Sequence, residues 1–355
     1  MLNPCVMTPQ TFYVDTLKKL QERTDLGSDE AERLLDSIFE QQLSEIQIAA
    51  LLVALAAKGE AISEVVGFVR GMRRFAVKLN HDQEGLVDTA GTGGDGSGTF
   101  NISTCAAFVI AGAGIPVAKH GNRAISGRCG SADVLSHLGV NIEAPKHVLE
   151  NCLAACGITF LFAPAFHPAM KIVGRVRKEL GIRTLFNLLG PLLNPAGARR
   201  QVLGVFAPHL TELLGEALLQ LDCDHALIVS SEDGLDEISL GARTRITELR
   251  DRQLRSYFVS PEEFGMERHP KEALAGGETG PNAQTLRGIL ASEVTDARRD
   301  VVLLNAGAGI YVSGRAESLQ QGLEMARQSL VSGKALEKLE LLVKHSNPAS
   351  AASLA

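Results

Sequence analysis

Residues 88–104 read Asp88-Thr-Ala-Gly-Thr-Gly-Gly-Asp-Gly-Ser-Gly-Thr-Phe-Asn-Ile-Ser-Thr104, and this stretch decides the fold class. Five glycines fall between Gly91 and Gly98, and an apolar run begins directly behind Asn101. A glycine-rich loop adopts left-handed backbone angles and lets a ligand approach the backbone closely. The helix expected next would offer its N-terminal N–H groups and positive dipole end to an anion. The stretch predicts a strand, a phosphate-binding loop and a helix; taken alone, a flexible surface loop is the alternative.

The sequence around this loop alternates between short β-type runs and helical stretches. Further helices are expected from Ser131 and over residues 146–156. The expected strands cover residues 86–88, 115–118, 159–162, 201–206, 226–230 and 244–249. Such alternation predicts an α/β domain with a mostly parallel central sheet flanked by helices. Ligands in that architecture bind where strands end and helices begin, which is where the glycine loop lies.

Residues 1–78 have the pattern of helices only. Ser44 and Gln47 form a capping-box pattern before the apolar run 48–57, and Gly59 ends that helix. The run is apolar nearly all round, so we expect both of its faces to be covered, in part by a second subunit. The last 75 or so residues read as helices with a loose tail after Asn347. The chain is therefore predicted to have a small all-helical domain and a larger α/β domain.

Composition narrows the class of protein. A chain of 355 residues with 45% hydrophobic content buries one large core or two modest ones. It has no run of roughly 18 apolar residues and no N-terminal secretion signal, so no membrane span is expected. Six scattered cysteines make no disulfide framework, which favours a reducing, cytoplasmic location. A net charge of −6 argues against a nucleic-acid surface.

A second polar cluster follows the glycine loop by one β-α step. It reads Lys119-His-Gly-Asn-Arg-Ala-Ile-Ser-Gly-Arg-Cys-Gly-Ser-Ala-Asp133 and places four side chains with nitrogen donors in its first five positions. Lysine, arginine and backbone N–H groups are the mixture that polyanions bind. A solvated basic turn is the alternative. Two adjacent β-α loops with the same chemistry favour a single phosphate site.

Two further stretches carry candidate chemistry. The turn 232–239 places Asp236 and Glu237 behind an expected strand, and paired carboxylates there suit Mg²⁺ beside substrate phosphates. The stretch 162–195 combines a helix bearing Arg175, Arg177 and Lys178 with a Gly-Pro turn among apolar residues. An apolar slot with one arginine suits a flat aromatic acid. An acidic turn or a basic helical face is by itself usually just solvated.

Four motifs together resemble the anthranilate phosphoribosyltransferase family. They are Gly91–Asp95 with Asn101–Thr104, Lys119–Ala124, Arg183–Leu192 and Asp233–Glu237, in the order of the family. The resemblance covers roughly residues 15–345. It implies transfer of the phosphoribosyl group of phosphoribosyl pyrophosphate to anthranilate in tryptophan synthesis, with Mg²⁺. It also implies a homodimer formed through the helical domain, with residues 165–185 returning to domain 1–78, while 79–164 and 186–355 form the α/β domain.

The resemblance also implies roles for individual residues. Those for phosphoribosyl pyrophosphate are Gly91, Gly94, Asp95, Thr99, Asn101, Ile102, Ser103, Thr104, Lys119, His120, Gly121, Asn122, Arg123, Ala124, Ile125, Ser126, Gly127 and Ser131. Those for anthranilate are Gly91, His120, Asn122, Pro164, His167, Met170, Arg177 and Gly190. Those for Mg²⁺ are Ser103, Asp236 and Glu237, and those for catalysis are Lys119, His120 and Arg177.

The chain departs from the family pattern at two of these positions. Gly127 stands where the family usually has a second serine, so a hydroxyl contact to phosphate is lost there. Met170 stands where some members carry tyrosine, which alters the aromatic packing. Two other functions stay open: a pyrimidine nucleoside phosphorylase of related fold, and a non-catalytic nucleic-acid-binding relative. The intact Asp236-Glu237 pair and a pI of about 5.9 argue against the second.

Overall fold

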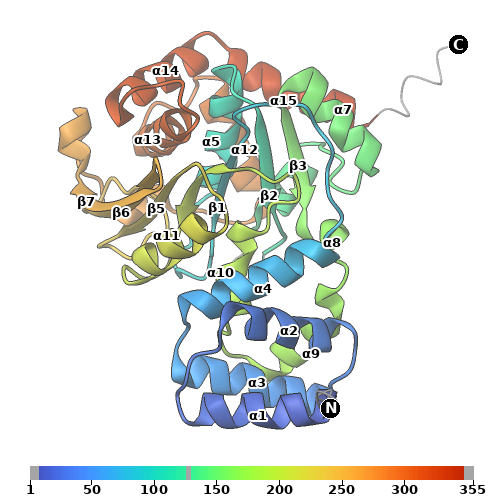
Figure 1. Cartoon of the computed structure of the whole chain (residues 1–355). Helices are drawn as coiled ribbons and strands as arrows, with labels where there is room; N and C mark the ends of the chain where they lie inside the picture. Colours follow the sequence, from blue (N-terminus) through green and yellow to red (C-terminus); the bar gives the residue numbers. More distant parts are fainter. Residues whose placement is uncertain (1–7, 125–128, 348–355) are drawn as a thin grey trace, which may run out of the picture. The chain divides into compact units, whose positions relative to one another are not determined.

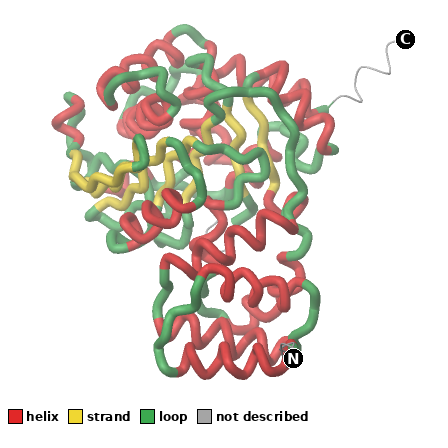
Figure 2. The backbone as a smooth tube through the Cα atoms, viewed as in Figure 1, coloured by secondary structure: helices red, strands yellow, loops and turns green. Residues whose placement is uncertain are grey.

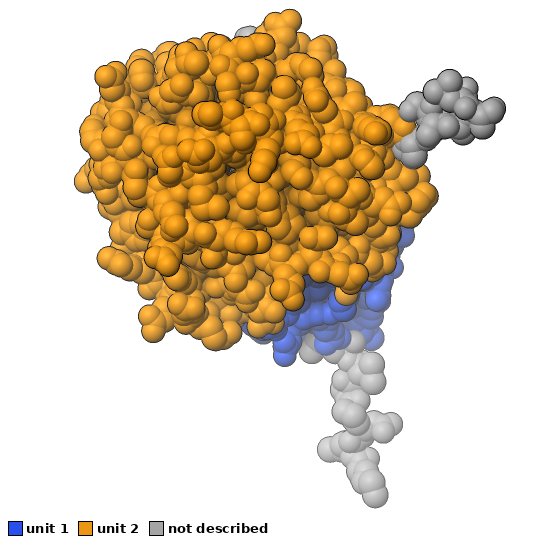
Figure 3. Space-filling model, turned by 90° about the horizontal axis from the view of Figure 1, so that it is seen from above, with its two compact units in different colours: residues 1–77, 167–193 blue, residues 78–166, 194–355 orange. Residues whose placement is uncertain are grey.

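The computed structural model describes residues 8–124 and 129–347, which form two compact units. Unit 1 comprises residues 1–77 and 167–193, and unit 2 comprises residues 78–166 and 194–355 (Figure 3). The returning segment is therefore longer than expected, since 186–193 was assigned to the α/β domain. Phe186 packs edge-on against Phe68 with ring centroids 5.7 Å apart, and Arg73 donates to the Leu192 carbonyl at 2.9 Å. These contacts hold the segment in unit 1.

Unit 1 consists of helices. They are α1 (Pro9–Gln21), α2 (Ser28–Phe39), α3 (Glu45–Lys58), α4 (Ile62–Phe75), α9 (Met170–Leu180), α10 (Phe186–Leu189) and the 3-10 helix η1 (Gly190–Leu192). The predicted capping box is present: the Gln47 N–H donates to Ser44 Oγ and the Ser44 N–H to Gln47 Oε1. Gly59 ends α3 with φ +94°, as predicted.

Close packing of α2 on α4 depends on two glycines. A Cβ at Gly67 would lie 2.2 Å from the Ser28 carbonyl oxygen, and one at Gly71 would lie 2.7 Å from the Leu35 side chain. Larger residues would push the helices apart and open the core between them. Buried Glu64 connects the same region, because its carboxylate accepts from the Leu26 N–H and pairs with Lys58 at 3.1 Å.

Unit 2 is built on the sheet drawn in yellow in Figure 2. The sheet has seven strands in the order β3-β2-β1-β4-β5-β6-β7. The strands are β1 (Val87–Gly91), β2 (Val117–Gly121), β3 (Ile158–Phe162), β4 (Arg200–Gly204), β5 (His225–Ser231), β6 (Thr244–Arg250) and β7 (Gln253–Val259). The first five are parallel, whereas β6 and β7 are antiparallel. The mostly parallel sheet is confirmed, and every expected strand overlaps an observed one.

Strand β7 is the one that the sequence analysis missed. It pairs with β6 through a two-residue turn in which Asp251 and Arg252 have φ of 52° and 58°. That left-handed pair is typical of hairpin turns, but Asn-Gly or Asp-Gly is its usual sequence signal. Most side chains of β7 are not buried, so the strand lacks a clear apolar pattern as well.

Helices cover both faces of the sheet. They are α5 (Ile102–Gly112), α6 (Ser131–His137), α7 (Lys146–Cys156), α8 (Ala163–Phe166), α11 (Leu210–Gln220), α12 (Thr279–Leu290), α13 (Ala297–Val312), α14 (Leu319–Val331) and α15 (Lys334–Ser346), with 3-10 helices η2 (Pro261–Phe264) and η3 (Lys271–Leu274). Cys152 and Cys156 are buried on α7. Among the described residues, no helix is long and apolar enough to cross a membrane.

The chain leaves the sheet in opposite directions from two neighbouring strands. From β1 it continues through α5 to β2, and from β4 it continues through α11 to β5. Because such crossovers are right-handed, α5 and α11 must lie on opposite faces, as Figure 1 shows. The carboxyl ends of β1 and β4 are therefore the topological switch point of the sheet, the place where ligands bind in this architecture.

Candidate functional site

The glycine loop leaves β1 at this switch point. Gly93, Gly94, Gly96 and Gly98 all have left-handed φ values, from 63° to 73°, so the backbone freedom predicted from sequence is used. The loop is anchored at its far side by residues 274–276. The Gly276 N–H donates to the Gly98 carbonyl at 2.8 Å, and the Phe100 N–H donates to the Leu274 carbonyl at 3.2 Å. Thr99 forms an isolated bridge with Ala275 in the same place.

The acidic turn sits directly on the carboxyl ends of β1 and β4. A Cβ at Gly91 would lie 2.6 Å from Asp236 Oδ2, and one at Gly204 would lie 1.7 Å from the Asp236 carbonyl oxygen. Only glycine at the ends of both strands leaves room for this turn. The Gly93 N–H donates to Asp236 Oδ2 at 3.1 Å, and the Asp236 N–H points at Asp95 Oδ2 at 3.5 Å. The glycine loop and the acidic turn thus form one site.

Three carboxylates, those of Asp95, Asp236 and Glu237, crowd this site. Burial, with the neighbouring Asp95 carboxylate as the second cause, raises the pKa of Asp236 to about 7. Burial raises the pKa of Glu237 to about 8, with the Asp236 charge adding to it and Lys119 opposing it. Both side chains keep part of their surface accessible to solvent. Closely spaced carboxylates with raised pKa values are an arrangement that a divalent cation relieves.

Lys119 supplies the positive charge of the site from the end of β2. Its side chain is buried, and Nζ donates to the Thr89 carbonyl at 2.5 Å and to Ser103 Oγ at 3.3 Å. Burial lowers the pKa of Lys119, while the Asp88 and Glu237 carboxylates oppose that shift. The predicted metal residue Ser103 and the predicted phosphate residue Lys119 are therefore in contact.

The N-terminus of α5 already holds a carboxylate. The Ser103 N–H donates to the Glu237 side chain, which holds down the raised pKa of that group. Asn101 stands at the N-cap position with its amide donating to the Cys129 carbonyl at 3.1 Å and its oxygen accepting from Asn282 at 3.2 Å. The side chains of Ile102 and Thr104 are buried, so any contact they make to a ligand runs through the backbone.

The second loop is organised by Asp133, which the sequence analysis did not single out. Its carboxylate accepts from the N–H groups of Ala124 and Gly130 and pairs with Arg123 at 3.0 Å. Asn122 is fixed nearby, because its carbonyl accepts from Ser131 Oγ at 3.2 Å. Gly121, the last residue of β2, lies against the same serine, because a Cβ there would be 2.2 Å from Ser131 Oγ. The predicted residues Ile125, Ser126 and Gly127 lie outside the described residues.

The structure separates the basic residues of α9 in unit 1. Arg175 is exposed and pairs with Glu179 at 2.8 Å and with Glu45 at 3.7 Å. Arg177 is half-buried, its guanidinium lies 5.4 Å from the centre of the Phe186 ring, and burial lowers its pKa. The residue pattern of the helix does not rank the two, whereas the resemblance selects Arg177, the arginine that lies against Phe186 of α10.

The other residues predicted for anthranilate are divided between the units. His167, Met170 and Gly190 belong to unit 1, whereas Pro164 lies on α8 of unit 2 with the loop residue Asn122. His167 is buried, and burial lowers its pKa to about 4, so its ring is neutral at physiological pH.

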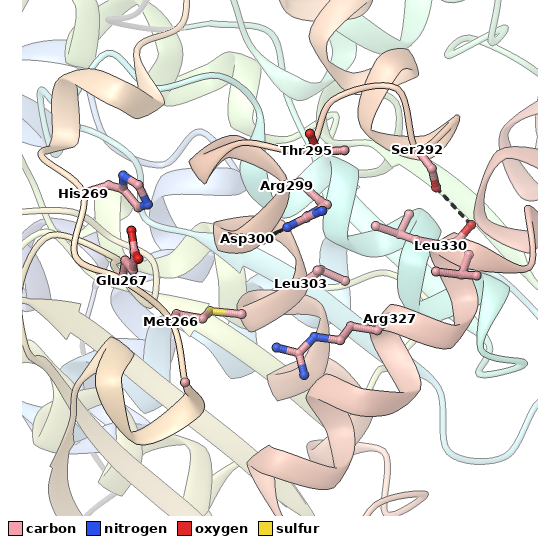
Figure 4. A pocket seen from close by; sticks show the side chains of 12 residues that line it. Met266, Glu267, His269, Ser292, Thr295, Arg299, Asp300, Leu303, Arg327 and Leu330 are labelled. Atoms are coloured by element: carbon pink, nitrogen blue, oxygen red, sulfur yellow. Dashed lines mark hydrogen bonds and ion pairs between the residues drawn. The ribbon is translucent and has the colours of Figure 1, made fainter.

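A separate cavity of about 430 Å³ lies between α13, α14 and the segment after η2 (Figure 4). Its floor includes Met266, Leu303 and Leu330, and Arg299 at its wall is ion-paired with Asp300 at 2.7 Å. None of its lining residues was predicted for the site. The cavity offers little unmatched charge to a phosphate, unlike the switch point.

Comparison with known proteins gives a consistent result. Two models of a glycosyl transferase family match the chain, the helical bundle domain over residues 14–76 and the a/b domain over residues 83–336. The anthranilate phosphoribosyltransferase of Desulfosudis oleivorans is 50% identical over 94% of this chain and 98% of its own length. That of Haloarcula marismortui is 49% identical over 92% of this chain and 98% of its own.

Solved structures agree with these sequences. The crystal structure of anthranilate phosphoribosyltransferase from Thermus thermophilus matches with a TM-score of 0.89 and 44% identity, over 94% of this chain and 99% of that chain. The enzyme from Saccharomyces cerevisiae in complex with phosphoribosyl pyrophosphate and Mg matches with a TM-score of 0.88 and 27% identity, over 96% and 99%.

Proposed function

The chain belongs to the anthranilate phosphoribosyltransferase family, and we propose on that premise that it transfers the 5-phosphoribosyl group of phosphoribosyl pyrophosphate to the amine of anthranilate. Pyrophosphate is the leaving group, and Mg²⁺ assists. One observation carries the proposal: the acidic turn at Asp236 meets the glycine loop and Lys119 at the switch point of the sheet. Such a site offers both a cation position and phosphate donors.

The residues present fit a magnesium ion. We assign Ser103, Asp236 and Glu237 as the residues that would hold it, and Mg²⁺ would then neutralise charge that develops on pyrophosphate. Among the described residues, no three His, Cys, Asp or Glu side chains are arranged to enclose a metal. Mg²⁺ suits such a site, because it commonly takes one or two carboxylates and completes its shell with water and substrate phosphates.

The protein groups act mainly by electrostatics and alignment. Breaking the bond at ribose C1 leaves an oxocarbenium-like centre and a leaving group of rising negative charge. We assign Lys119 and the backbone N–H groups of the glycine loop to stabilise that charge from fixed positions. An aryl amine is a nucleophile while neutral, so attack requires no strong base. We assign His120 to contact the substrate and to accept the proton as the bond forms.

We propose that anthranilate is oriented by one cation within a mostly uncharged lining. Arg177 would bind the carboxylate in a bidentate manner, and Asn122 would help to orient the acceptor. The remaining assigned residues are Gly91, His120, Pro164, His167, Met170 and Gly190. Neutral His167 adds no second charge, which suits an acid with a single carboxylate.

We also propose a homodimer that forms through helix α3 of unit 1. Ile46 is 82% exposed and Val53 is 42% exposed, and a spacing of seven residues places them on one face of the helix. A single chain leaves this face uncovered, and the sequence analysis expects a second subunit to cover part of the helix. A second copy of unit 1 would cover the exposed face. Light scattering with Ile46→Glu should show a shift from dimer toward monomer.

The direct test is the loss of anthranilate fluorescence when phosphoribosyl pyrophosphate and Mg²⁺ are added. Consumption of anthranilate that requires both additions supports the proposal. Phosphorolysis of thymidine in place of this reaction would indicate the nucleoside phosphorylase. Salt-sensitive retention of DNA without turnover would indicate the nucleic-acid-binding relative.

A further inference from the structure

A buried carboxylate outside the assigned site holds the strand that carries Lys119. Asp88, the second residue of β1, is fully buried. Its Oδ1 accepts the backbone N–H of His120 at 3.1 Å, and its Oδ2 accepts Nδ2 of Asn194 at 2.7 Å. It is also one of the two carboxylates whose charge acts on Lys119, the other being Glu237.

Asn194 uses its whole amide in this arrangement. Nδ2 donates to Asp88 and also to the Ala118 carbonyl at 2.7 Å, while Oδ1 accepts the Ala196 N–H at 2.9 Å. Asn194 is the first residue of unit 2 after the segment 167–193 of unit 1. The amide therefore links the chain at residue 194 to β1 through Asp88 and to β2 through Ala118.

We propose that Asp88 and Asn194 are a positioning pair for the donor site, which sets the place of Lys119 and His120 and ties it to the chain returning from unit 1. The proposal rests on the proposed function, because its consequence is measured on phosphoribosyl pyrophosphate. Neither residue faces a ligand in this assignment. Each acts through the end of β2.

Two observations favour positioning over simple core packing. First, Asp88 accepts the backbone N–H of His120, the residue directly after Lys119. A small shift of the Asp88 side chain would therefore move both Lys119 and His120. Second, two carboxylates, Asp88 and Glu237, act on the charge of Lys119. Because Glu237 is assigned to the metal, Asp88 is the one that balances the charge of Lys119 alone. A core carboxylate without these links would affect stability only.

The test is an exchange of the two side chains. Asp88→Asn places one amide donor against another, and Asn194→Asp places one carboxylate against another. The double variant Asp88→Asn, Asn194→Asp restores the donor–acceptor pair between the two side chains and keeps one negative charge in the cluster, but it leaves the Ala118 carbonyl without its donor. Glu248→Gln is the matched control, since it changes another carboxylate of unit 2 that is partly buried and hydrogen-bonded.

We expect each single variant to lower kcat/KM for phosphoribosyl pyrophosphate by about tenfold to a hundredfold, the range set by a lost hydrogen bond to a charged group. KM for anthranilate should change much less, and the double variant should recover part of the loss, because it restores the contact between the two side chains but not the hydrogen bond to the Ala118 carbonyl. The rise in Tm on adding phosphoribosyl pyrophosphate with Mg²⁺ should shrink and recover in parallel. Glu248→Gln should leave all three quantities unchanged.

The proposal is overturned if the singles lower only Tm, or if the double variant sums their losses. Should Asp88→Asn not fold, Asn194→Ala keeps Asp88 and removes its amide partner, and it must show the same selective loss. The ligand-induced Tm rise does not involve anthranilate. A wild-type protein that binds the donor but does not consume anthranilate would therefore refute the proposed acceptor and leave the positioning pair testable.

Discussion

Partly buried carboxylates at two places in unit 2 balance negative charge differently. At the switch point, Asp95, Asp236 and Glu237 crowd one another, and burial and mutual repulsion raise the pKa values of the last two. On strand β6, burial also raises the pKa of Glu248, but donors outweigh it and hold that pKa below its ordinary value. These donors include the Tyr311 hydroxyl at 2.7 Å.

The difference separates structure from function. A carboxylate with its full set of donors fixes neighbouring elements, as Glu248 joins β5, β7 and α13 through His225, Tyr257 and Tyr311. Carboxylates crowded without enough donors cost stability, so such a group indicates a ligand site. The two arginines of α9 differ in the same way. Arg175 is exposed and paired with Glu179, whereas Arg177 is half-buried and burial lowers its pKa, as expected of a group in a ligand site.

The largest effect is expected at the crowded carboxylates. Asp236→Ala with Glu237→Ala should lower kcat by about a thousandfold, because the loss of metal stabilisation amounts to several kcal/mol. The double variant should also raise the Tm of the metal-free protein, since the repulsion is gone. Steady-state kinetics over a Mg²⁺ titration measure the first effect. An unchanged Mg²⁺ dependence would sink the metal assignment.

The next effect compares the two arginines. Arg177→Ala should raise KM for anthranilate by about tenfold or more, the cost of losing a charged hydrogen-bond partner. KM for phosphoribosyl pyrophosphate should change less. Arg175→Ala is the matched control on the same helix and should leave both values unchanged. Equal changes in both KM values for Arg177→Ala would refute its specific role.

Glu248→Gln should act on stability alone. It weakens hydrogen bonds to a buried charged group, and the free energy of unfolding should fall by about 1–3 kcal/mol. Denaturant unfolding measures that fall, while kcat and both KM values should match the wild type. A loss of activity without a loss of stability would contradict the structural role given to Glu248 in contrast to the carboxylates at the switch point.

The crowded carboxylates at the switch point should also make the stability of the protein depend on pH. The folded pKa values of Asp236 and Glu237, about 7 and 8, lie above the ordinary carboxyl values near 4. The folded metal-free protein therefore binds more protons than the unfolded chain between these limits, and its stability falls as pH rises from about 4 to about 8. Its Tm should be lower at pH 8.5 than at pH 6, and less so in Asp236→Asn with Glu237→Gln.

The effect at His120 is expected to be limited. Because the amine of anthranilate attacks while neutral, His120→Ala should leave measurable turnover, within about a hundredfold of the wild type, the lower end of the usual contribution of proton transfer. Single-turnover kinetics would separate the chemical step from binding. Complete loss of turnover would instead make His120 an essential base.

Much of the fold follows from local pattern. Strands β1 to β6 and helices α3, α5 and α7 were predicted because apolar runs, caps and glycines report on neighbouring residues. The antiparallel hairpin was missed at β7, whose side chains are mostly not buried and whose turn carries Asp251-Arg252 in place of glycine. The return of 186–193 to unit 1 was also missed, because it depends on the contact of Phe186 with Phe68.

The candidate site divides in the same way. Sequence indicated Asp95, Lys119 and the Asp236-Glu237 pair, because donors and carboxylates behind strands have a recognisable spacing. It did not indicate Gly204, Asp133 or Asn194, which are separated along the chain from the groups they serve. Their importance appears only through close approach: Gly204 to the Asp236 turn, Asp133 to Ala124 and Gly130, and Asn194 to Asp88.

The sequence by itself determined which chemical groups stand behind each strand of this protein, because strands, caps and glycine turns are set within a few residues. Only the tertiary structure decided that the acidic turn, more than 130 residues after the glycine loop, rests on the ends of β1 and β4 and crowds its carboxylates against Asp95. Charge balance is a property of groups brought together in space. For that reason the raised pKa values, and the contrast with Glu248, arise from packing rather than from order along the chain.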